Sequence, residues 1–311
     1  MSKLKKLIIF SLILFVSCGE TPKKEQTENN ESSKVEGVWE RRGTIQYINS
    51  KPIDTVFYGI DDTGEVEGFR NVKIYSEGNI FWLNNSPSNT PWKGGPGGYG
   101  KYKIEKDQMV EYMSHGTGGM GDYLNYVKDS TGLNSIRFPF DYSVSEKNYV
   151  QIGGRVPNSS DNIRYGEFYE KLPFMKNSKL DGVWKRAYEI SYVNGVAIDT
   201  TSVPKDALLD IKVIKDGYFI WQVDNTKLIN DQSKPNYGGN GGFGQIDVSN
   251  ENIVEYTEFG SGTITNNNDP RTNPHYAKLI FYDDDDLFQQ ITKDTLNQNF
   301  AGRGVVYRRV K

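Results

Sequence analysis

The chain contains a single cysteine, Cys18, in 311 residues. No intramolecular disulfide can form, so each folding unit must depend on its own apolar core. Only two histidines are present, His115 and His275, and they do not occupy matching places in the internal repeat described below. A zinc site needs about three or four protein ligands, which this composition does not place together. We therefore expect no metal site and no cofactor.

The chain also lacks a large excess of charge of either sign. It has 37 basic and 40 acidic side chains, interspersed, for a net charge of −3. A nucleic-acid-binding domain normally carries a basic patch or stripe. No such patch is visible in the sequence, so nucleic acid is not an expected partner.

Long hydrophobic runs are absent. The longest, residues 7–16, is apolar except for Ser11 and follows three lysines in the first six residues. It is shorter than the roughly 20 residues that cross a bilayer, and this arrangement is typical of a signal peptide. The run leads directly to Cys18, and this junction resembles the lipobox of bacterial lipoproteins. The resemblance implies a signal peptide over residues 1–18 and lipid modification of Cys18; an ordinary cleaved signal or a short anchor are the alternatives.

Residues 19–34 contain neither aromatic nor aliphatic side chains and are rich in Glu, Lys, Asn, Ser and Thr. Such a composition cannot bury enough surface to offset the entropy of ordering. We interpret the segment as a flexible tether that holds the folded part about 20–25 Å from the lipid. The expected location is the cell envelope, on the outer membrane, with the membrane itself as partner.

The rest of the chain is an internal duplication. Gly37-Val38-Trp39 recurs as Gly182-Val183-Trp184, 145 residues later, and Val110-Glu111-Tyr112 recurs as Val254-Glu255-Tyr256, 144 residues later. The offset changes only between matched blocks, where connections tolerate insertions. We therefore predict two domains, residues 35–173 and 179–311. Each is of ordinary single-domain size, and we expect the second to fold alone.

Period-two alternation predicts strands throughout both halves. Lys101-Tyr102-Lys103-Ile104-Glu105 alternates cleanly before a turn at Lys106-Asp107, and Asp216-Gly217 is a turn signal between two further strands. Residues 218–221 are apolar on both faces, which indicates a central strand. Only residues 294–299 show a weak helical period. The sequence predicts an all-β fold of two antiparallel β-barrels.

The Gly-x-Trp that opens each half resembles the lipocalin signature, and the ordered set of blocks resembles the small lipocalin-like domains of bacterial lipoproteins. In lipocalins the Trp plugs the closed end of the barrel and an Arg from the last strand packs across it. The resemblance implies that Trp39 and Trp184 close their barrels, with Arg309 across the second. The first half offers Glu170-Lys171 at that place, and lysine stacks less well than a guanidinium.

Three tryptophans are candidate ligand contacts. Trp82 and Trp221 occupy matching strands, and their parity, shared with Ile80 and Phe219, should point them into the lumens. Trp92 stands in a Gly- and Pro-rich loop without a counterpart in the second half. It is a candidate contact for a partner or a sugar, or a cover for the barrel mouth.

Arg41 and Arg186 follow the signature Trp by two residues and so share its strand face. They could meet an anionic head group in the lumen, but buried Arg is rare unless paired, so a rim position is favoured. Tyr112 and Tyr256, at matching places, complete the candidate ligand-binding set. The glutamate beside each Tyr is interpreted as a cross-strand partner or an inward polar group.

No set of residues indicates catalysis. A nucleophile elbow of the Gly-x-Ser-x-Gly kind is absent. Gly95-x-Gly97-x-x-Gly100 matches the sequence pattern of the dinucleotide-binding fingerprint. A predicted strand follows it, however, where phosphate binding needs the start of a helix. Residues Asp283, Asp284, Asp285 and Asp286 lack the spacing of a calcium loop. We interpret them as a solvated turn, although cation binding stays open.

These observations favour a lipid-anchored envelope protein, not an enzyme, that holds a small apolar or amphiphilic ligand in a barrel lumen. The alternative is a structural or interaction lipoprotein whose barrels are filled by side chains and whose loops contact another envelope protein or a glycan. Lumen volume distinguishes the two, because a ligand site needs a few hundred Å³ of open space.

The anchor gives the first testable prediction. Cys18→Ala removes the thiol that lipidation requires, so the variant should leave the membrane fraction or remain unprocessed. Detergent phase partitioning and the size of the mature protein measure both effects. A variant that partitions with the detergent as fully as the wild type, at the mature size, would contradict the lipoprotein interpretation.

Overall fold

The computed structural model describes residues 34–57, 70–85, 97–117, 119–155, 162–203, 210–223, 240–260, 270–282, 286–292 and 301–311. The proposed signal peptide with Cys18, almost all of the tether, Trp92 and the weakly helical stretch 294–299 lie outside these residues. The strands of both predicted domains lie within them.

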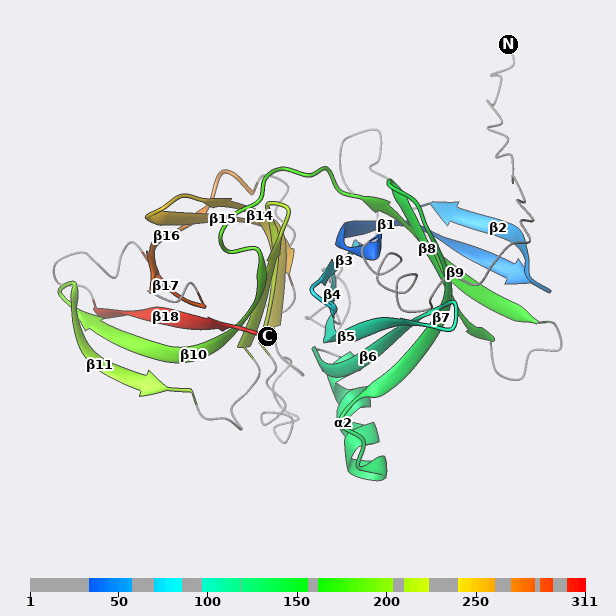
Figure 1. The fold of residues 1–311 in the computed structure, drawn as a ribbon, viewed down its shortest axis with the longest axis horizontal. Helices are drawn as coiled ribbons and strands as arrows, with labels where there is room; N and C mark the ends of the chain where they lie inside the picture. Colours follow the sequence, from blue (N-terminus) through cyan, green and yellow to red (C-terminus); the bar gives the residue numbers. More distant parts are fainter. Residues whose placement is uncertain are drawn as a thin grey trace, which may run out of the picture.

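The first half forms a closed antiparallel barrel (Figure 1). Its nine strands are β1 (Gly37–Ile48), β2 (Lys51–Phe57), β3 (Asn71–Ser76), β4 (Asn79–Asn84), β5 (Gly97–Glu105), β6 (Gln108–Thr117), β7 (Ile136–Val144), β8 (Asn148–Arg155) and β9 (Ile163–Lys171). Pairing of β1 with both β3 and β9 closes an eight-stranded ring. Strand β2 pairs with the second half of β1, beyond the ring.

The second half repeats this topology strand for strand. Its strands are β10 (Gly182–Val193), β11 (Val196–Ser202), β12 (Asp210–Lys215), β13 (Tyr218–Val223), β14 (Asn240–Val248), β15 (Asn252–Gly260), β16 (His275–Phe281), β17 (Leu287–Thr292) and β18 (Ala301–Arg309). Strand β10 pairs with both β12 and β18. The prediction of an all-β fold with two tandem antiparallel barrels is confirmed, and the barrels fit the lipocalin-like description.

Tight turns connect the strands where the sequence indicates them. Asp216 and Gly217, between β12 and β13, both have positive φ, at 56° and 88°. Lys106 and Asp107, between β5 and β6, have φ of 47° and 69°. Two consecutive residues with positive φ are typical of the primed turns whose twist matches that of a β-hairpin.

Trp184 closes one end of the second barrel. Its side chain is fully buried, and its Nε1 donates a hydrogen bond of 2.6 Å to the carbonyl of Leu180. The Arg309 guanidinium lies 4.2 Å above the indole centroid and donates to the carbonyls of Asp181 and Lys179. Arg309 thus ties β18, the last strand of this barrel, to the residues that directly precede β10.

The first barrel is closed in the same way, with a lysine in place of the arginine. Trp39 is fully buried and donates through Nε1 to the carbonyl of Val35, at 2.7 Å. Lys171 Nζ lies 5.2 Å from the Trp39 ring centroid and donates to the carbonyl of Glu36 at 2.9 Å. The single ammonium reaches one carbonyl where Arg309 reaches two.

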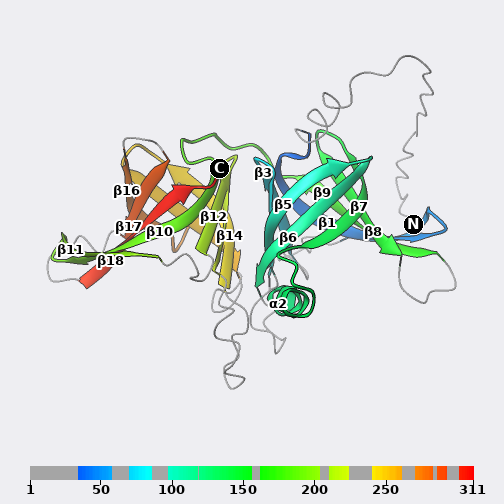
Figure 2. The ribbon, with the colours of Figure 1, turned by 60° about the horizontal axis from the view of Figure 1, so that its bottom comes forward.

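Each barrel has an apolar core of its own, and a third core lies between the barrels. The outer faces of β3, β4 and β5 pack against those of β12, β13 and β14 (Figure 2). The residues of this third core are Val38, Val72, Ile74, Phe81, Leu83, Tyr99, Val183, Ile211, Val213, Tyr218, Ile220, Phe243 and Phe259. This packing explains why the central strands are apolar on both faces.

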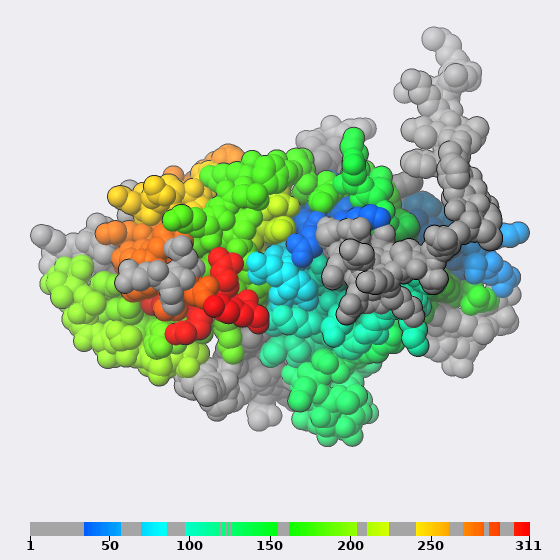
Figure 3. Space-filling view, viewed as in Figure 1, coloured from blue at the N-terminus to red at the C-terminus, as the bar shows by residue number. Residues whose placement is uncertain are grey.

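Polar contacts fix the register of the two barrels. Gln222 Nε2 donates to the carbonyls of Trp82 and Gly98, at 2.8 and 3.2 Å. Arg70 joins Glu40 of its own barrel, at 2.8 Å, to Glu258 of the other barrel, at 3.0 Å. Burial lowers the pKa of Arg70, whereas the two carboxylates raise it. The net shift of the pKa is upward. The space-filling view shows the two halves in close contact (Figure 3).

One helix breaks the symmetry and was not predicted from the sequence. Helix α2 (Gly119–Thr131) connects β6 to β7 and packs against β5 and β6. Leu124 is fully buried and Met120 is partly buried, and both join the core of the first barrel. Met120, Tyr123, Leu124 and Val127 follow the i, i+3, i+4, i+7 spacing of an amphipathic helix, so a helical signal was present in the sequence and was missed. No helix in the described residues is long and apolar enough to cross a membrane.

The core between the barrels modifies the expectation for the isolated second half. Residues 179–311 contain a complete barrel core, so the fragment should fold, but it exposes an apolar face and should self-associate. Ile220→Asp places a charge on that face, because Ile220 is fully buried there. In the fragment the substitution should restore a monomer, whereas in the full chain it should lower the melting temperature.

Sedimentation velocity and thermal unfolding measure these opposite effects. Ile198→Asp is the control in both backgrounds, because Ile198 is 62% exposed on β11. A wild-type fragment that is monomeric, with the stability of the full chain, would contradict the importance of this interface.

Candidate functional site

A cavity of about 340 Å³ occupies the lumen of the first barrel. Its apolar lining side chains are Trp82, Met113, Met120, Phe138 and Phe140. Its charged and amide lining side chains are Arg41, Asn71, Lys73, Asn84, Glu111, Gln151 and Glu167. Polar and apolar groups thus face one partly open space, which suits an amphiphilic molecule.

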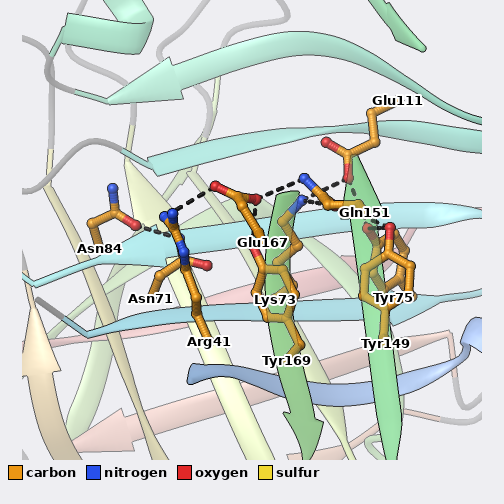
Figure 4. Close-up of polar contacts among 10 residues, drawn as sticks. All are labelled: Arg41, Asn71, Lys73, Tyr75, Asn84, Glu111, Tyr149, Gln151, Glu167 and Tyr169. Atoms are coloured by element: carbon orange, nitrogen blue, oxygen red, sulfur yellow. Dashed lines mark hydrogen bonds and ion pairs between the residues drawn. The ribbon is translucent and has the colours of Figure 1, made fainter. Parts of the chain in front are cut away.

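A buried triad of Lys73, Glu111 and Gln151 forms the inner polar surface of this cavity. Lys73 Nζ lies 2.8 Å from Glu111 Oε1 and 2.7 Å from Gln151 Oε1 (Figure 4). The three side chains come from β3, β6 and β8, and each residue is less than 5% exposed. Charges so deeply buried are stable only when they are paired and hydrogen-bonded.

Three tyrosines extend the network towards the closed end. Tyr75 donates to Glu111 at 2.7 Å, Tyr149 to Gln151 at 2.9 Å, and Tyr169 to Glu167 at 2.8 Å. Burial raises the pKa of all three phenols well above the usual range, and the neighbouring carboxylates add to the shift. The phenols therefore stay protonated and act as donors, Tyr75 and Tyr169 to carboxylates and Tyr149 to the Gln151 amide oxygen.

Arg41 lies on the cavity wall and not at the rim, so the rim position favoured from the sequence is wrong. Its Nη1 lies 3.0 Å from Glu167 Oε1, and its Nη2 donates to Thr44 Oγ1 at 2.8 Å. The side chain is only 14% exposed. Parity correctly placed Arg41 on the strand face of Trp39. Its buried position is stable because it pairs with Glu167 on β9, a partner that the sequence does not reveal.

The second barrel contains a smaller cavity of about 270 Å³ with an equivalent triad. Lys212 Nζ pairs with Glu255 Oε1 at 2.5 Å and with Gln290 Oε1 at 3.0 Å. All three residues are less than 10% exposed. Because the triad is present in both barrels, we interpret it as part of the common scaffold.

The environment of the lumen arginine differs between the barrels. Arg186 lines the second cavity and pairs with Asp210 at 2.9 Å and with Glu189. Asp210 and Glu189 occupy the places of Asn71 and Thr44 in the first barrel. The counter-charge thus lies on β10 and β12 in the second barrel and on β9 in the first.

The structure places two of the aromatic candidates on cavity walls and two on the outer faces of the barrels. Trp82 and Trp221 line the first and second cavities, as their parity predicts. Tyr112 and Tyr256 lie on the outer faces instead: Tyr112 donates to Glu105 at 2.5 Å, and the Arg271 guanidinium lies 4.6 Å from the Tyr256 ring. Neither Tyr lines either of these two cavities, because the alternation of the strand directs the adjacent glutamate inward.

Both histidines lie on strands, whereas loop positions are expected from the sequence for two such isolated residues. His115 is on β6, where burial and then Lys128 and Lys185 lower its pKa to about 4. His275 lines the second cavity from β16. Among the described residues no three potential ligands are grouped for a metal ion. Asp286 contacts Lys311, and Asp283, Asp284 and Asp285 lie outside the described residues.

Sequence reasoning missed Lys73, Gln151 and Glu167 as lumen residues. A signal was present for the lysine: Lys73 and Lys212 interrupt otherwise apolar strands at matching places. A lysine kept between apolar neighbours in both halves indicates an inward charge that needs a partner. Which residue provides that partner depends on strand pairing around the barrel.

No protein-family model matches the chain, and no curated protein matches it. Among solved structures, the chain is similar to a protein of unknown function from the DUF3598 family of Nostoc punctiforme PCC 73102. The sequence identity is 10%, the alignment covers 89% of this chain and 97% of that one, and the TM-score is 0.23.

The buried triad gives a prediction on stability. Lys73→Met leaves the Glu111 carboxylate buried without its cation, which should destabilise the fold by about 3–5 kcal/mol. Adding Glu111→Gln removes the stranded charge and should recover much of the loss. Urea unfolding measures the free energy of each variant.

Lys103→Met is the control, because Lys103 is exposed on β5 and should change stability by no more than about 0.5 kcal/mol. Equal effects of Lys73→Met and Lys103→Met would show that the triad contributes nothing.

Proposed function

We propose that this protein is a lipid-anchored cell-envelope protein, placed on the outer membrane, that binds a small amphiphilic ligand inside its first barrel. The observation that carries the proposal is the cavity of about 340 Å³, which is lined by both polar and apolar side chains. Binding cavities for small molecules are about 300–1,000 Å³ and mostly apolar, with a few placed polar groups. The first cavity falls within this size range and presents apolar side chains together with polar ones.

The anchoring part of the proposal is supported by the N-terminal sequence. Three lysines, a short apolar run and Cys18 are followed by a polar tether of 16 residues. Lipidated proteins with two or more acyl chains remain bound to a membrane without a spanning helix. A ligand-binding barrel held in this way would sample molecules released from, or delivered to, the adjacent lipid surface.

The role proposed is binding and not catalysis. The two carboxylates of the first cavity, Glu111 and Glu167, are each engaged by a cation and by a protonated phenol. Such groups are paired and hydrogen-bonded within the wall, which suits a fixed polar surface better than proton transfer.

Ligand titration tests the proposal. The wild type should bind a member of a panel of medium-chain amphiphiles (fatty alcohol, fatty acid, monoacylglycerol and lysophospholipid) saturably, with a change in tryptophan fluorescence. Because Trp82 lines the first cavity, Trp82→Phe should remove most of that change. Trp221→Phe, the matched substitution in the second cavity, should leave it.

Folded wild type that binds no member of the panel would overturn the proposal. The interaction protein, whose loops contact an envelope protein or a glycan, would then be the better hypothesis.

A further inference from the structure

The glycines that match the dinucleotide-binding fingerprint lie within strands. Residues 97–100 belong to β5, and residues 241–244 occupy the matching places in β14. Gly98 and Gly242 do not have a positive φ, so their backbone conformation is open to any residue. The reason for a glycine at these two positions must therefore lie in the side chains that surround them.

Gly98 is covered by a side chain of the first cavity. It pairs with Trp82 across β4 and β5, and directly opposed residues share one face of the sheet. Trp82 is half-buried and lines the cavity. A methyl group built on Gly98 would lie 2.7 Å from Trp82 Cε2 and 2.5 Å from Met113 Cε. Carbon atoms in contact are about 3.5–4.0 Å apart, so the indole and the methionine occupy the space that a side chain at position 98 would need.

Gly100, two residues further along β5, is a different case. A methyl group there would collide with the carbonyl of Tyr112, next to the register shift between β5 and β6. This glycine serves the backbone of a β-bulge. Gly98 instead serves the packing of side chains in the lumen.

The residue opposite Gly98 makes room for helix α2. Gly98 pairs with Gly116 of β6, and a methyl group on Gly116 would lie 2.8 Å from Met120 Cγ. Two facing glycines thus leave a depression in the barrel wall, which the side chains of Trp82 and Met120 fill. Both side chains line the first cavity, so the depth of the depression sets how far they reach into it.

The second barrel repeats the position of the tryptophan. Gly242 pairs with Trp221, and a methyl group on Gly242 would lie 2.9 Å from Trp221 Cε2. Thr257 stands at the place of Met113, so the methionine beside the indole belongs to the first barrel. The duplication thus supplies a matched glycine on which a control substitution can be made.

From these contacts we infer that Gly98 is a positioning residue that determines how wide a ligand the first cavity accepts. Because position 98 has no side chain, the indole of Trp82 lies close against β5 and leaves the lumen in front of it open to a ring as well as to a linear chain. A side chain at position 98 would push the indole away from the strand and into the cavity. The inference rests on the proposed function and names the residue that sets ligand width in the same cavity.

Isothermal titration of the full chain with decanol and cyclodecanol tests the inference. Both molecules have ten carbons and one hydroxyl, and they differ in width. The wild type should bind both. Gly98→Ala should bind cyclodecanol about tenfold more weakly, because the displaced indole overpacks the lumen against the ring, and decanol less than about threefold more weakly. Gly242→Ala, the matched control, moves Trp221 in the other barrel and should leave both affinities unchanged.

A double-variant cycle identifies the side chain through which Gly98 acts. Trp82→Leu removes the ring that the added methyl group meets. In this background Gly98→Ala should change the affinity for cyclodecanol by less than about twofold, since substitutions at positions in contact are not additive. A backbone role of Gly98 would instead give the same loss in both backgrounds.

Thermal unfolding of the same four proteins provides a measurement without ligand. Gly98→Ala should lower the melting temperature of the wild type and should lower that of Trp82→Leu less. Folding of the double variant where Gly98→Ala alone does not fold would also support the inference. Failure of both to fold, where Trp82→Leu folds, would show that Gly98 serves the backbone and would overturn it.

The outcomes separate the inference from the proposed function. Equal losses of affinity for the two alcohols, binding of decanol without cyclodecanol by the wild type, or an undiminished effect of Gly98→Ala in the Trp82→Leu background would overturn the inference and leave a ligand-binding barrel. No binding of either alcohol or of the wider amphiphile panel by folded wild type would overturn both.

Discussion

The packing of β3, β4 and β5 against β12, β13 and β14 is the constraint on which the arrangement of the chain depends. The contact brings equivalent strands together, β3 with β12 and β4 with β13, which is the pattern of an isologous dimer interface. Where they meet, these strands have no solvent face. Most of their outward residues are apolar to pack against the other barrel, with Gln222 as a polar exception, so buried charge is placed mainly at inward positions.

Lys73 and Lys212 show the consequence. Each stands between outward apolar neighbours that belong to the core between the barrels, and each points into its own lumen. There the lysine is buried and stable because a glutamate and a glutamine from distant strands accept its hydrogen bonds. The common scaffold therefore places one buried lysine at the matching position of each cavity.

Duplication has left the scaffold alike and the cavities different. The Trp plug, the cation above it and the lysine triad recur in both barrels. The partner of the lumen arginine and the pair Asn71–Asn84 do not, and helix α2 adds Met120 to the first cavity. The two cavities therefore differ in the groups around a constant frame and not in the frame itself.

The sequence by itself determined the duplication, the strands and the direction of their side chains, because period-two alternation and repeated turn signals are local properties. Parity thus placed Trp82 and Trp221 at the lumens, whereas the closed-end position of Trp39 and Trp184 was implied by the resemblance of the Gly-x-Trp signature to that of lipocalins. Tertiary structure alone decided which side chains meet. Arg41 lies on the cavity wall because Glu167, 126 residues away, reaches it across the β1–β9 closure. Strand register and barrel closure create such pairs, and neither is encoded within a short stretch of sequence.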